Sequence, residues 1–339
     1  MENLAIKNLG GFLASVAMAA VLFYFVLYAR NVTHYIPAKY ISSKRWGGII
    51  LGGVILVTLA IFQNITNGFL LFKDLWSLIL GIVILLIGGA WDDLKKISWK
   101  KQLLIQSGAA FVAVAVGDTV EHIRLPGGEI LFFSPFLSAV LAYLWIILVI
   151  EALNWLDGVD GLSGGISFVT LLVLAVLGST QIVNQPSTTL LCLIVAGTLL
   201  GFLFFNFPPA KVYLGSSGVW IIGFLIAVIS LYSGGKVATT ALVLGIPIMD
   251  FIFVSVERLW AGKWPVFGGD RLHLHEKLTD KGWSPTKITL VFCVFSIFLG
   301  VGALLSQTRG KYFLALPLAG FFLLFALGLK RTKARYQRK

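Results

Sequence analysis

Two pairs of aspartates stand where long apolar stretches of this sequence end. Asp157 and Asp160 lie three residues apart in a glycine-rich segment, and Asp92 and Asp93 directly follow another apolar run. A carboxylate is costly beside hydrocarbon, so such pairs are usually kept for a function. Carboxylates gathered on one side of a membrane suit Mg²⁺ bound together with substrate phosphates. The competing interpretation of each pair is a solvated loop with helix-capping aspartates, but the presence of two pairs favours a site.

Small and basic residues beside other apolar runs could bind anions. Ser216 lies in the Gly-Ser-Ser-Gly segment at 215–218, which opens an apolar run and whose free N–H groups suit phosphate. Asn206 ends the preceding run just before two prolines, which stop a helix. Lys44 and Arg45 precede a further apolar run. They suit an anion, although the excess of basic residues in the cytoplasmic loops of membrane proteins explains them equally well.

The longest polar segment, residues 257–286, contains two of the four histidines. His273 and His275 could offer zinc ligands, but no cysteine or further histidine nearby completes a set of four. Together with Arg271, they fit better as donors to a pyrophosphate, given the carboxylates elsewhere in the chain. A polar loop with incidental histidines is the alternative.

Composition assigns the chain to the membrane proteins. Of its 339 residues, 58% are hydrophobic and 12% are charged, whereas soluble domains carry about 25% charged residues. Apolar runs of roughly 20 residues recur up to the C-terminus, which a signal peptide alone does not explain. The net charge of +12 reflects the positive-inside rule and gives no reason to expect nucleic-acid binding. The two cysteines lie inside apolar runs and form neither a disulfide framework nor a metal-binding spacing.

The sequence therefore predicts an all-α polytopic membrane protein of about eleven transmembrane helices, forming a single domain over residues 1–339. With the N-terminus outside and the C-terminus inside, most lysines and arginines face the cytoplasm, and so do both aspartate pairs. A short β-hairpin near 122–132 lies outside, and a basic tail at 330–339 lies in the cytoplasm. The predicted spans lie near residues 10–30, 46–64, 69–90, 102–117, 132–153, 165–183, 187–206, 213–232, 237–256, 286–306 and 312–329.

Several of these segments, in the same order, resemble one enzyme family. The elements are Asp92-Asp93, Asn154-x-x-Asp157-Gly-x-Asp160-Gly-Leu, Phe205-Asn206 with Gly215, and Asp270-Arg271-x-His273-Leu-His275. Together they are similar to the polyprenyl-phosphate N-acetylhexosamine-1-phosphate transferases, glycosyltransferase family 4. The histidine segment resembles the undecaprenyl-phosphate GlcNAc-1-phosphate branch more than the related phospho-MurNAc-pentapeptide translocases.

The resemblance implies a reaction. A polyprenyl phosphate, expected to be undecaprenyl phosphate, attacks the β-phosphorus of a UDP-N-acetylhexosamine and UMP leaves. The group transferred is expected to be GlcNAc-1-phosphate, in the first membrane step of cell-envelope glycopolymer synthesis, such as that of teichoic acid or lipopolysaccharide. Mg²⁺ is the expected cofactor, with Mn²⁺ as a substitute. A multi-pass protein of the bacterial plasma membrane, in contact with membrane lipid and assembled as a homodimer, is expected.

The resemblance and the residue patterns together also give roles to residues. One departure affects these roles, because Ser216 stands where the family usually has an aspartate that binds metal. A catalytically impaired homologue that binds lipid or nucleotide-sugar, or acts as a scaffold, is therefore the alternative function. A transporter is a third interpretation, but no chain of charges crosses the predicted spans. The expected residues are Asp92, Asp93, Asp157, Asp160, His273 and His275 for catalysis; Lys44, Arg45, Asn154, Asn206, Ser216 and Arg271 for substrate binding; and Asp93, Asp157 and Asp160 for the metal.

Overall fold

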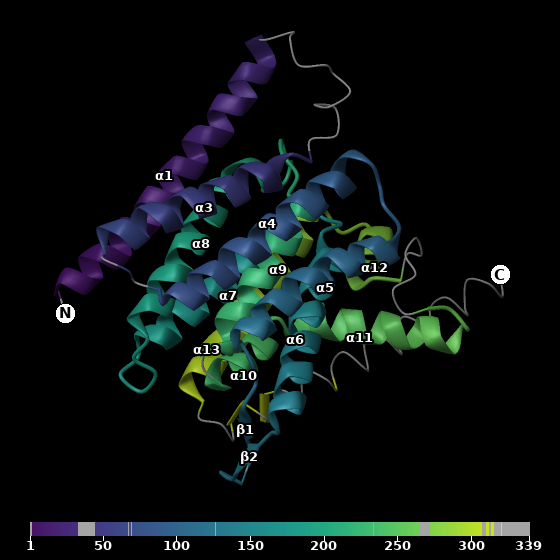
Figure 1. Cartoon of the computed structure of the whole chain (residues 1–339). Helices are drawn as coiled ribbons and strands as arrows, with labels where there is room; N and C mark the ends of the chain where they lie inside the picture. Colours follow the sequence, from purple (N-terminus) through teal and green to yellow (C-terminus); the bar gives the residue numbers. More distant parts are fainter. Residues whose placement is uncertain are drawn as a thin grey trace.

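The protein is a bundle of long helices with one small hairpin, seen here in a computed structural model (Figure 1). The structure describes residues 2–32, 45–66, 68, 70–125, 127–232, 234–264, 272–306, 310, 311, 313, 314 and 320. The elements are α1 (Glu2–Val32), α3 (Gly47–Ile65), α4 (Phe72–Leu94), α5 (Trp99–Val116), β1 (His122–Arg124), β2 (Ile130–Phe132), α6 (Pro135–Leu156), α7 (Leu162–Ser179), α8 (Pro186–Asn206), α9 (Gly215–Leu231), α10 (Gly234–Val243), α11 (Gly245–Trp260), α12 (Leu274–Asp280) and α13 (Pro285–Leu305).

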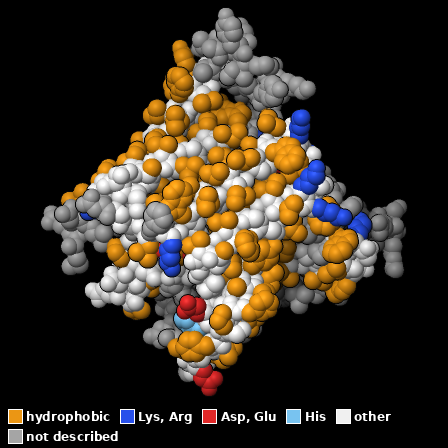
Figure 2. All heavy atoms as spheres, in the orientation of Figure 1, with side chains coloured by type: hydrophobic (Ala, Val, Ile, Leu, Met, Phe, Trp, Pro, Cys, Tyr) orange, Lys and Arg blue, Asp and Glu red, His pale blue; other side chains and the backbone are white. Residues whose placement is uncertain are grey.

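The helices confirm a multi-pass membrane protein. Among the described residues, 7 helices are long and apolar enough to cross a membrane, or up to 8 if the bent pair α10–α11 counts as one span. Figure 2 shows one face of the molecule that is largely hydrophobic, with most of its coloured charged side chains near its margins. A helix lies at every predicted span except 312–329, which falls mostly outside the described residues, as does the tail 330–339. The number of eleven spans and the orientation of the termini stay predictions.

The predicted span at 237–256 is not one continuous helix. The chain breaks at Leu244 into α10 and α11, whose axes differ by 73°. Pro247 lies in the first turn of α11. Its ring nitrogen has no proton to donate to the carbonyl of Val243, so a straight helix would lack a hydrogen bond at this point. The proline therefore fits the start of a new helix better than the interior of a long one.

Helix α9 forms the centre of the bundle. All of its residues except Ser216 are buried, and it packs against α3, α4, α5, α6, α7 and α10. Glycines on α9 and on a neighbouring helix allow this close packing: Gly81 of α4 receives the ring of Phe224, and Gly223 of α9 lies against the backbone of Ile150 in α6. Ser216 is the one less buried residue of α9, and it lines a cavity at the first turn of this helix.

The same helices position two sets of polar residues at opposite ends of the bundle. Helix α4 has 23 residues, which corresponds to a length of about 34 Å. Its last turn carries Asp92 and Asp93, next to the C-terminal ends of α6 and α8 and the N-terminal end of α9. Its first turn lies at the other end, near the antiparallel hairpin β1–β2, in which His122 pairs with Phe132. The hairpin predicted near 122–132 is thus confirmed.

Candidate active site

The segment after α6 is anchored by hydrogen bonds to distant parts of the chain. Gly161 adopts a left-handed conformation, with φ of 71°, at the start of α7, and such a conformation favours glycine. Its N–H donates to Oδ1 of Asn206 at 3.0 Å, while Nδ2 of Asn206 donates to the carbonyl of Val212 at 2.8 Å. Asn206 therefore ties the loop that contains Asp157 and Asp160 to the segment before α9.

Both aspartates of this loop have one oxygen engaged and one available. Oδ1 of Asp157 accepts a hydrogen bond from the Ser163 hydroxyl, and Oδ2 of Asp160 accepts from the N–H of Ala210 at 2.9 Å. Among the described residues, nothing bonds their second carboxylate oxygens. Burial, together with the charges of Asp93 and Asp160, raises the pKa of Asp157 to about 7, against the hydrogen bond from Ser163 and the charge of Arg45.

The first aspartate pair is bound to the start of α9. Asp93 accepts from the N–H of Ser216 at 2.8 Å, and from the N–H and hydroxyl of Ser217 at 3.1 and 2.7 Å. Asp92 accepts from the Ser216 hydroxyl at 2.5 Å and from Lys96 at 2.7 Å. Ser216 thus supplies a proton donor at a position where a carboxylate would face Asp92. These bonds also use the N–H groups of Ser216 and Ser217, which the sequence had predicted to bind phosphate.

One cavity brings six of the twelve predicted residues together, whereas Asp92, Asp93, His273 and His275 do not line it. It has a volume of about 570 Å³, which suits a small-molecule substrate. Arg45 and Lys96 place positive charge in the same cavity as Asp157 and Asp160, so both phosphate groups and a cation have partners there. The lining residues are Arg45, Lys96, Asn154, Asp157, Gly158, Val159, Asp160, Asn206, Tyr213, Leu214, Gly215 and Ser216. Lys44 and Arg271, which were predicted to bind substrate, lie outside the described residues.

The carboxylates fit Mg²⁺ as a pair. Within the described part of the chain, no group of three or more Asp, Glu, His or Cys residues could hold a metal ion. Mg²⁺ needs only one or two carboxylates when phosphates and waters complete its shell, and Asp157 and Asp160 each offer a free oxygen. Asp93 accepts one hydrogen bond on Oδ1 and two on Oδ2, which leaves one lone pair on Oδ1 for its predicted role as a ligand.

The two predicted histidines form a cluster next to this cavity. Oδ2 of Asp250 lies 2.8 Å from Nδ1 of His273, and Oδ1 of Asp250 accepts from the N–H of Leu274 at 2.8 Å. The rings of His273 and His275 stack with centroids 5.7 Å apart. A Cβ at Gly158 would lie 2.5 Å from Nε2 of His275. The absence of a side chain at Gly158 thus lets the histidine cluster approach the aspartate loop.

Sequence reasoning missed two buried acids in this region. Asp250 orients His273, and Glu151 accepts hydrogen bonds from Gln106 at 2.7 Å and from the indole of Trp155 at 2.9 Å. The guanidinium of Arg258 lies over the Trp155 ring, 4.5 Å from its centroid. Each acid interrupts an apolar run, and that signal could have identified both, because an ionisable residue inside a predicted span is a candidate functional residue by default.

His275 leads to a prediction about pH. Burial lowers the pKa of His275 from 6.5 to about 4, against the opposing charge of Asp250. The unfolded chain therefore takes up this proton at a higher pH than the folded protein does, so stability is lost as the pH falls from about 6.5 to about 4. We expect the thermal midpoint of the purified protein to fall across this window, and to fall less in His275→Gln. Equal slopes in the two proteins would contradict the prediction.

Comparisons with known proteins show which proteins this chain is similar to. Residues 75–234 match the family described as Glycosyl transferase family 4. The chain is 28% identical over 264 residues to a probable undecaprenyl-phosphate N-acetylglucosaminyl 1-phosphate transferase of Bacillus subtilis (strain 168), covering 76% of this chain and 73% of the relative. It is 28% identical over 308 residues to a phospho-N-acetylmuramoyl-pentapeptide-transferase of Dictyoglomus thermophilum, covering 86% and 95%.

A third relative has a slightly higher sequence identity. The undecaprenyl-phosphate alpha-N-acetylglucosaminyl 1-phosphate transferase of Thermotoga maritima is 30% identical over 266 residues, which cover 77% of this chain and 79% of the relative. The family match spans α4 to α9 and so contains both aspartate pairs, Asn206 and Ser216. With this identity and coverage, the chain belongs to glycosyl transferase family 4.

Proposed function

We propose that this protein transfers GlcNAc-1-phosphate from a UDP-sugar to polyprenyl phosphate and releases UMP. The observation that carries the proposal is that one cavity is lined by both Asp157 and Asp160 and by Arg45 and Lys96. Relatives named for N-acetylglucosaminyl 1-phosphate transfer to undecaprenyl phosphate support it. In the reaction, an oxygen of the lipid phosphate forms a bond to the β-phosphorus, and the bond from that phosphorus to the UMP oxygen breaks.

The side chains of the cavity have distinct tasks in this reaction. Arg45 and Lys96 bind the phosphate oxygens of donor and acceptor, because each offers charged N–H donors. Asp157 and Asp160 would hold Mg²⁺, which supplies positive charge against the departing phosphate when bound. Asp92 fixes Lys96 in place through its 2.7 Å bond, and Asn154 lines the side of the cavity formed by the end of α6.

An apolar groove beside the cavity suits the lipid chain. It is lined by Trp99, Leu103, Leu104 and Trp264, together with Lys100 and Ser107, and has a volume of about 460 Å³. Helix α5 begins with Trp99, three residues after Lys96. A phosphate bound by Lys96 would therefore have an apolar surface next to it for a polyprenyl tail, which gains free energy by leaving water.

The alternative, a homologue that binds these ligands without turnover, rests on Ser216. Its hydroxyl donates to Asp92 at 2.5 Å, whereas an aspartate there would place two carboxylates in contact. We therefore expect the natural sequence to release UMP, and Ser216→Asp to release less, because like charges repel at this distance. The assay uses purified protein in detergent with undecaprenyl phosphate, UDP-GlcNAc and Mg²⁺, and measures UMP by chromatography.

The controls separate the two functions. Ser216→Ala removes the hydroxyl without adding charge, and omission of the lipid shows whether UMP release depends on the acceptor. A silent natural protein together with an active Ser216→Asp variant would support the impaired homologue and contradict our proposal. Release that is unaffected by omitting undecaprenyl phosphate would also contradict it.

A further inference from the structure

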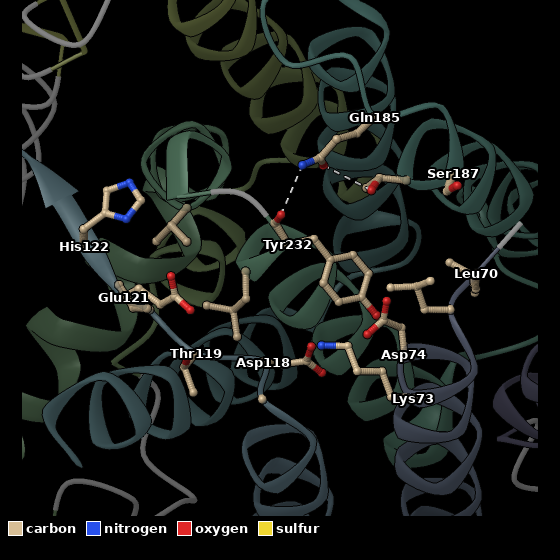
Figure 3. Close-up of a pocket in the computed structure, with 16 residues that line it drawn as sticks. Leu70, Lys73, Asp74, Asp118, Thr119, Glu121, His122, Gln185, Ser187 and Tyr232 are labelled. Carbon is tan, nitrogen blue, oxygen red and sulfur yellow. Dashed lines mark hydrogen bonds between the residues drawn. The ribbon is translucent and has the colours of Figure 1, made fainter. Parts of the chain in front are cut away.

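A second polar cavity lies at the end of the bundle opposite the candidate active site (Figure 3). Its volume is about 500 Å³, within the range of pockets that bind small molecules. Its walls come from the first turn of α4, the segment between α5 and β1, the start of α8 and the end of α9. The proposed transfer reaction uses none of these residues.

The inner part of this cavity contains carboxylates with incomplete hydrogen bonding. Asp118 is 7% exposed, and its Oδ2 accepts from the Ser77 hydroxyl at 2.9 Å. Among the described residues, Oδ1 of Asp118 has no such partner. Burial, together with the nearby charge of Asp74, raises the pKa of Asp118 to about 6, against the hydrogen bond from Ser77 and the charge of Lys73. The carboxylates of Asp74 and Asp118 are therefore close enough for their charges to interact.

The hydroxyl of Tyr232 points into the same part of the cavity. Its oxygen is buried and, within the described part of the chain, makes no hydrogen bond. Buried polar atoms of this kind are uncommon in folded proteins. Figure 3 shows the end of the Tyr232 side chain directed toward Asp74, with Asp118 nearby. The backbone carbonyl of Tyr232 accepts a bond from Gln185 at 3.1 Å, so the residue is held in place while its hydroxyl stays available.

Within the described ranges, the lysines of this region do not pair with the unbonded oxygens of Asp118 and Tyr232. Lys73 lies in the cavity wall and is exposed. Its charge lowers the pKa of Asp118, but no ion pair joins them among the described residues. The buried ammonium of Lys236 donates to Oε1 of Gln185. Glu121 adds a further carboxylate, beside His122. Three carboxylates thus share this cavity with Lys73.

We propose that this cavity binds a small polar ligand through a primary ammonium group. An ammonium has three N–H donors, and Oδ1 of Asp118, the carboxylate of Asp74 and the hydroxyl of Tyr232 offer three acceptors. A directly bound metal ion fits less well, because no group of three or more metal-ligating side chains among the described residues is placed to hold one ion, and the proposed reaction brings no phosphate here to complete the shell of an ion held by two carboxylates. An anionic ligand would face like charges. The amine could belong to a solute or to a lipid headgroup, and both present the same chemistry.

The test uses ethanolamine as the probe and ethylene glycol as its control, since the two differ by an ammonium in place of a hydroxyl. Saturation-transfer NMR on the full chain in detergent should show binding of ethanolamine only. Asp118→Asn should weaken binding about tenfold, as expected for loss of a charged hydrogen bond. Lys73→Gln should strengthen it, because a competing cation is removed. Glu129→Gln, an exposed carboxylate of the hairpin, should leave it unchanged.

UMP release serves as the check of folding, and Asp118→Asn and Lys73→Gln should both preserve it. If Asp118→Asn misfolds, Asp74→Asn provides a second test of the proposal. Native mass spectrometry from nanodiscs containing phosphatidylethanolamine identifies the source of the amine. Lipid retained by the natural protein but lost from Asp118→Asn indicates a headgroup, and ethanolamine binding without such retention indicates a solute. Equal signals from ethanolamine and ethylene glycol, or an ethanolamine signal unchanged in Asp118→Asn, would overturn the proposal.

Discussion

Replacing Asp160 with asparagine is expected to lower lipid-dependent UMP release by about a hundredfold to a thousandfold, the usual cost of losing a fixed charge at a reacting phosphate or oxyanion. Asparagine keeps an oxygen that can accept the 2.9 Å hydrogen bond from Ala210, so the loop should hold its shape. What it loses is the negative charge of the free oxygen, which the proposed Mg²⁺ requires. Asp157→Asn should have a similar effect, since the bond from Ser163 can also be kept.

The matched control is Asp118→Asn, the same substitution at a buried carboxylate at the other end of the bundle. This variant should release UMP at close to the natural rate. Folding of all variants is compared by gel filtration and thermal midpoint. If Asp160→Asn and Asp157→Asn both retained near-natural turnover with an unchanged dependence on Mg²⁺, these carboxylates would not be the metal ligands.

Adding one methyl group at Gly89 is expected to have an effect of similar size without touching any charge. A Cβ at Gly89 of α4 would overlap the backbone of Ser217, and a Cβ at Gly48 of α3 would overlap the backbone of Gly218. The first turn of α9 is thus held between two helices at contact distance. Gly89→Ala must displace this turn, which carries the N–H groups bound to Asp93. We expect UMP release to fall about a hundredfold, as for an ångström-scale displacement in an active site.

Gly53→Ala is the control for this prediction. Gly53 lies on α3 like Gly48, but a Cβ there would meet no atom within 4 Å. Its alanine variant should keep full activity and gain up to about 1 kcal/mol of stability, because alanine is the better helix former. The comparison is made on folded protein only, after gel filtration. Full activity in both Gly48→Ala and Gly89→Ala would show that the position of this turn is not critical.

The sequence was informative wherever a local pattern carried the signal. Apolar runs located the helices, and the glycine-rich segment that contains Asp157 and Asp160 marked the connection between two of them. The turn residues at 126–128 predicted the hairpin. These features depend on residues close together in the chain, where periodicity and turn preferences apply.

Features built from distant residues could not be read in the same way. The bonds from Ser216 and Ser217 to Asp93 join positions more than a hundred residues apart, and the pairing of Asp250 with His273 crosses a polar loop. No local periodicity marks such pairs. The break at Leu244 is different, because Pro247 gave a visible sign of it, but the continuous apolar pattern around the proline favoured one straight helix.

The burial of α9 has a consequence for how the protein is made. Helices of a membrane protein enter the bilayer before they associate with one another. Of the helices that surround α9, all but α10 precede it in the chain. All the helices that pack against α9, apart from α10, have therefore been synthesised before α9 itself. A chain that stopped before residue 215 would leave Asp93 without its hydrogen bonds from Ser216 and Ser217, so quality-control proteases should remove such fragments faster than the full protein.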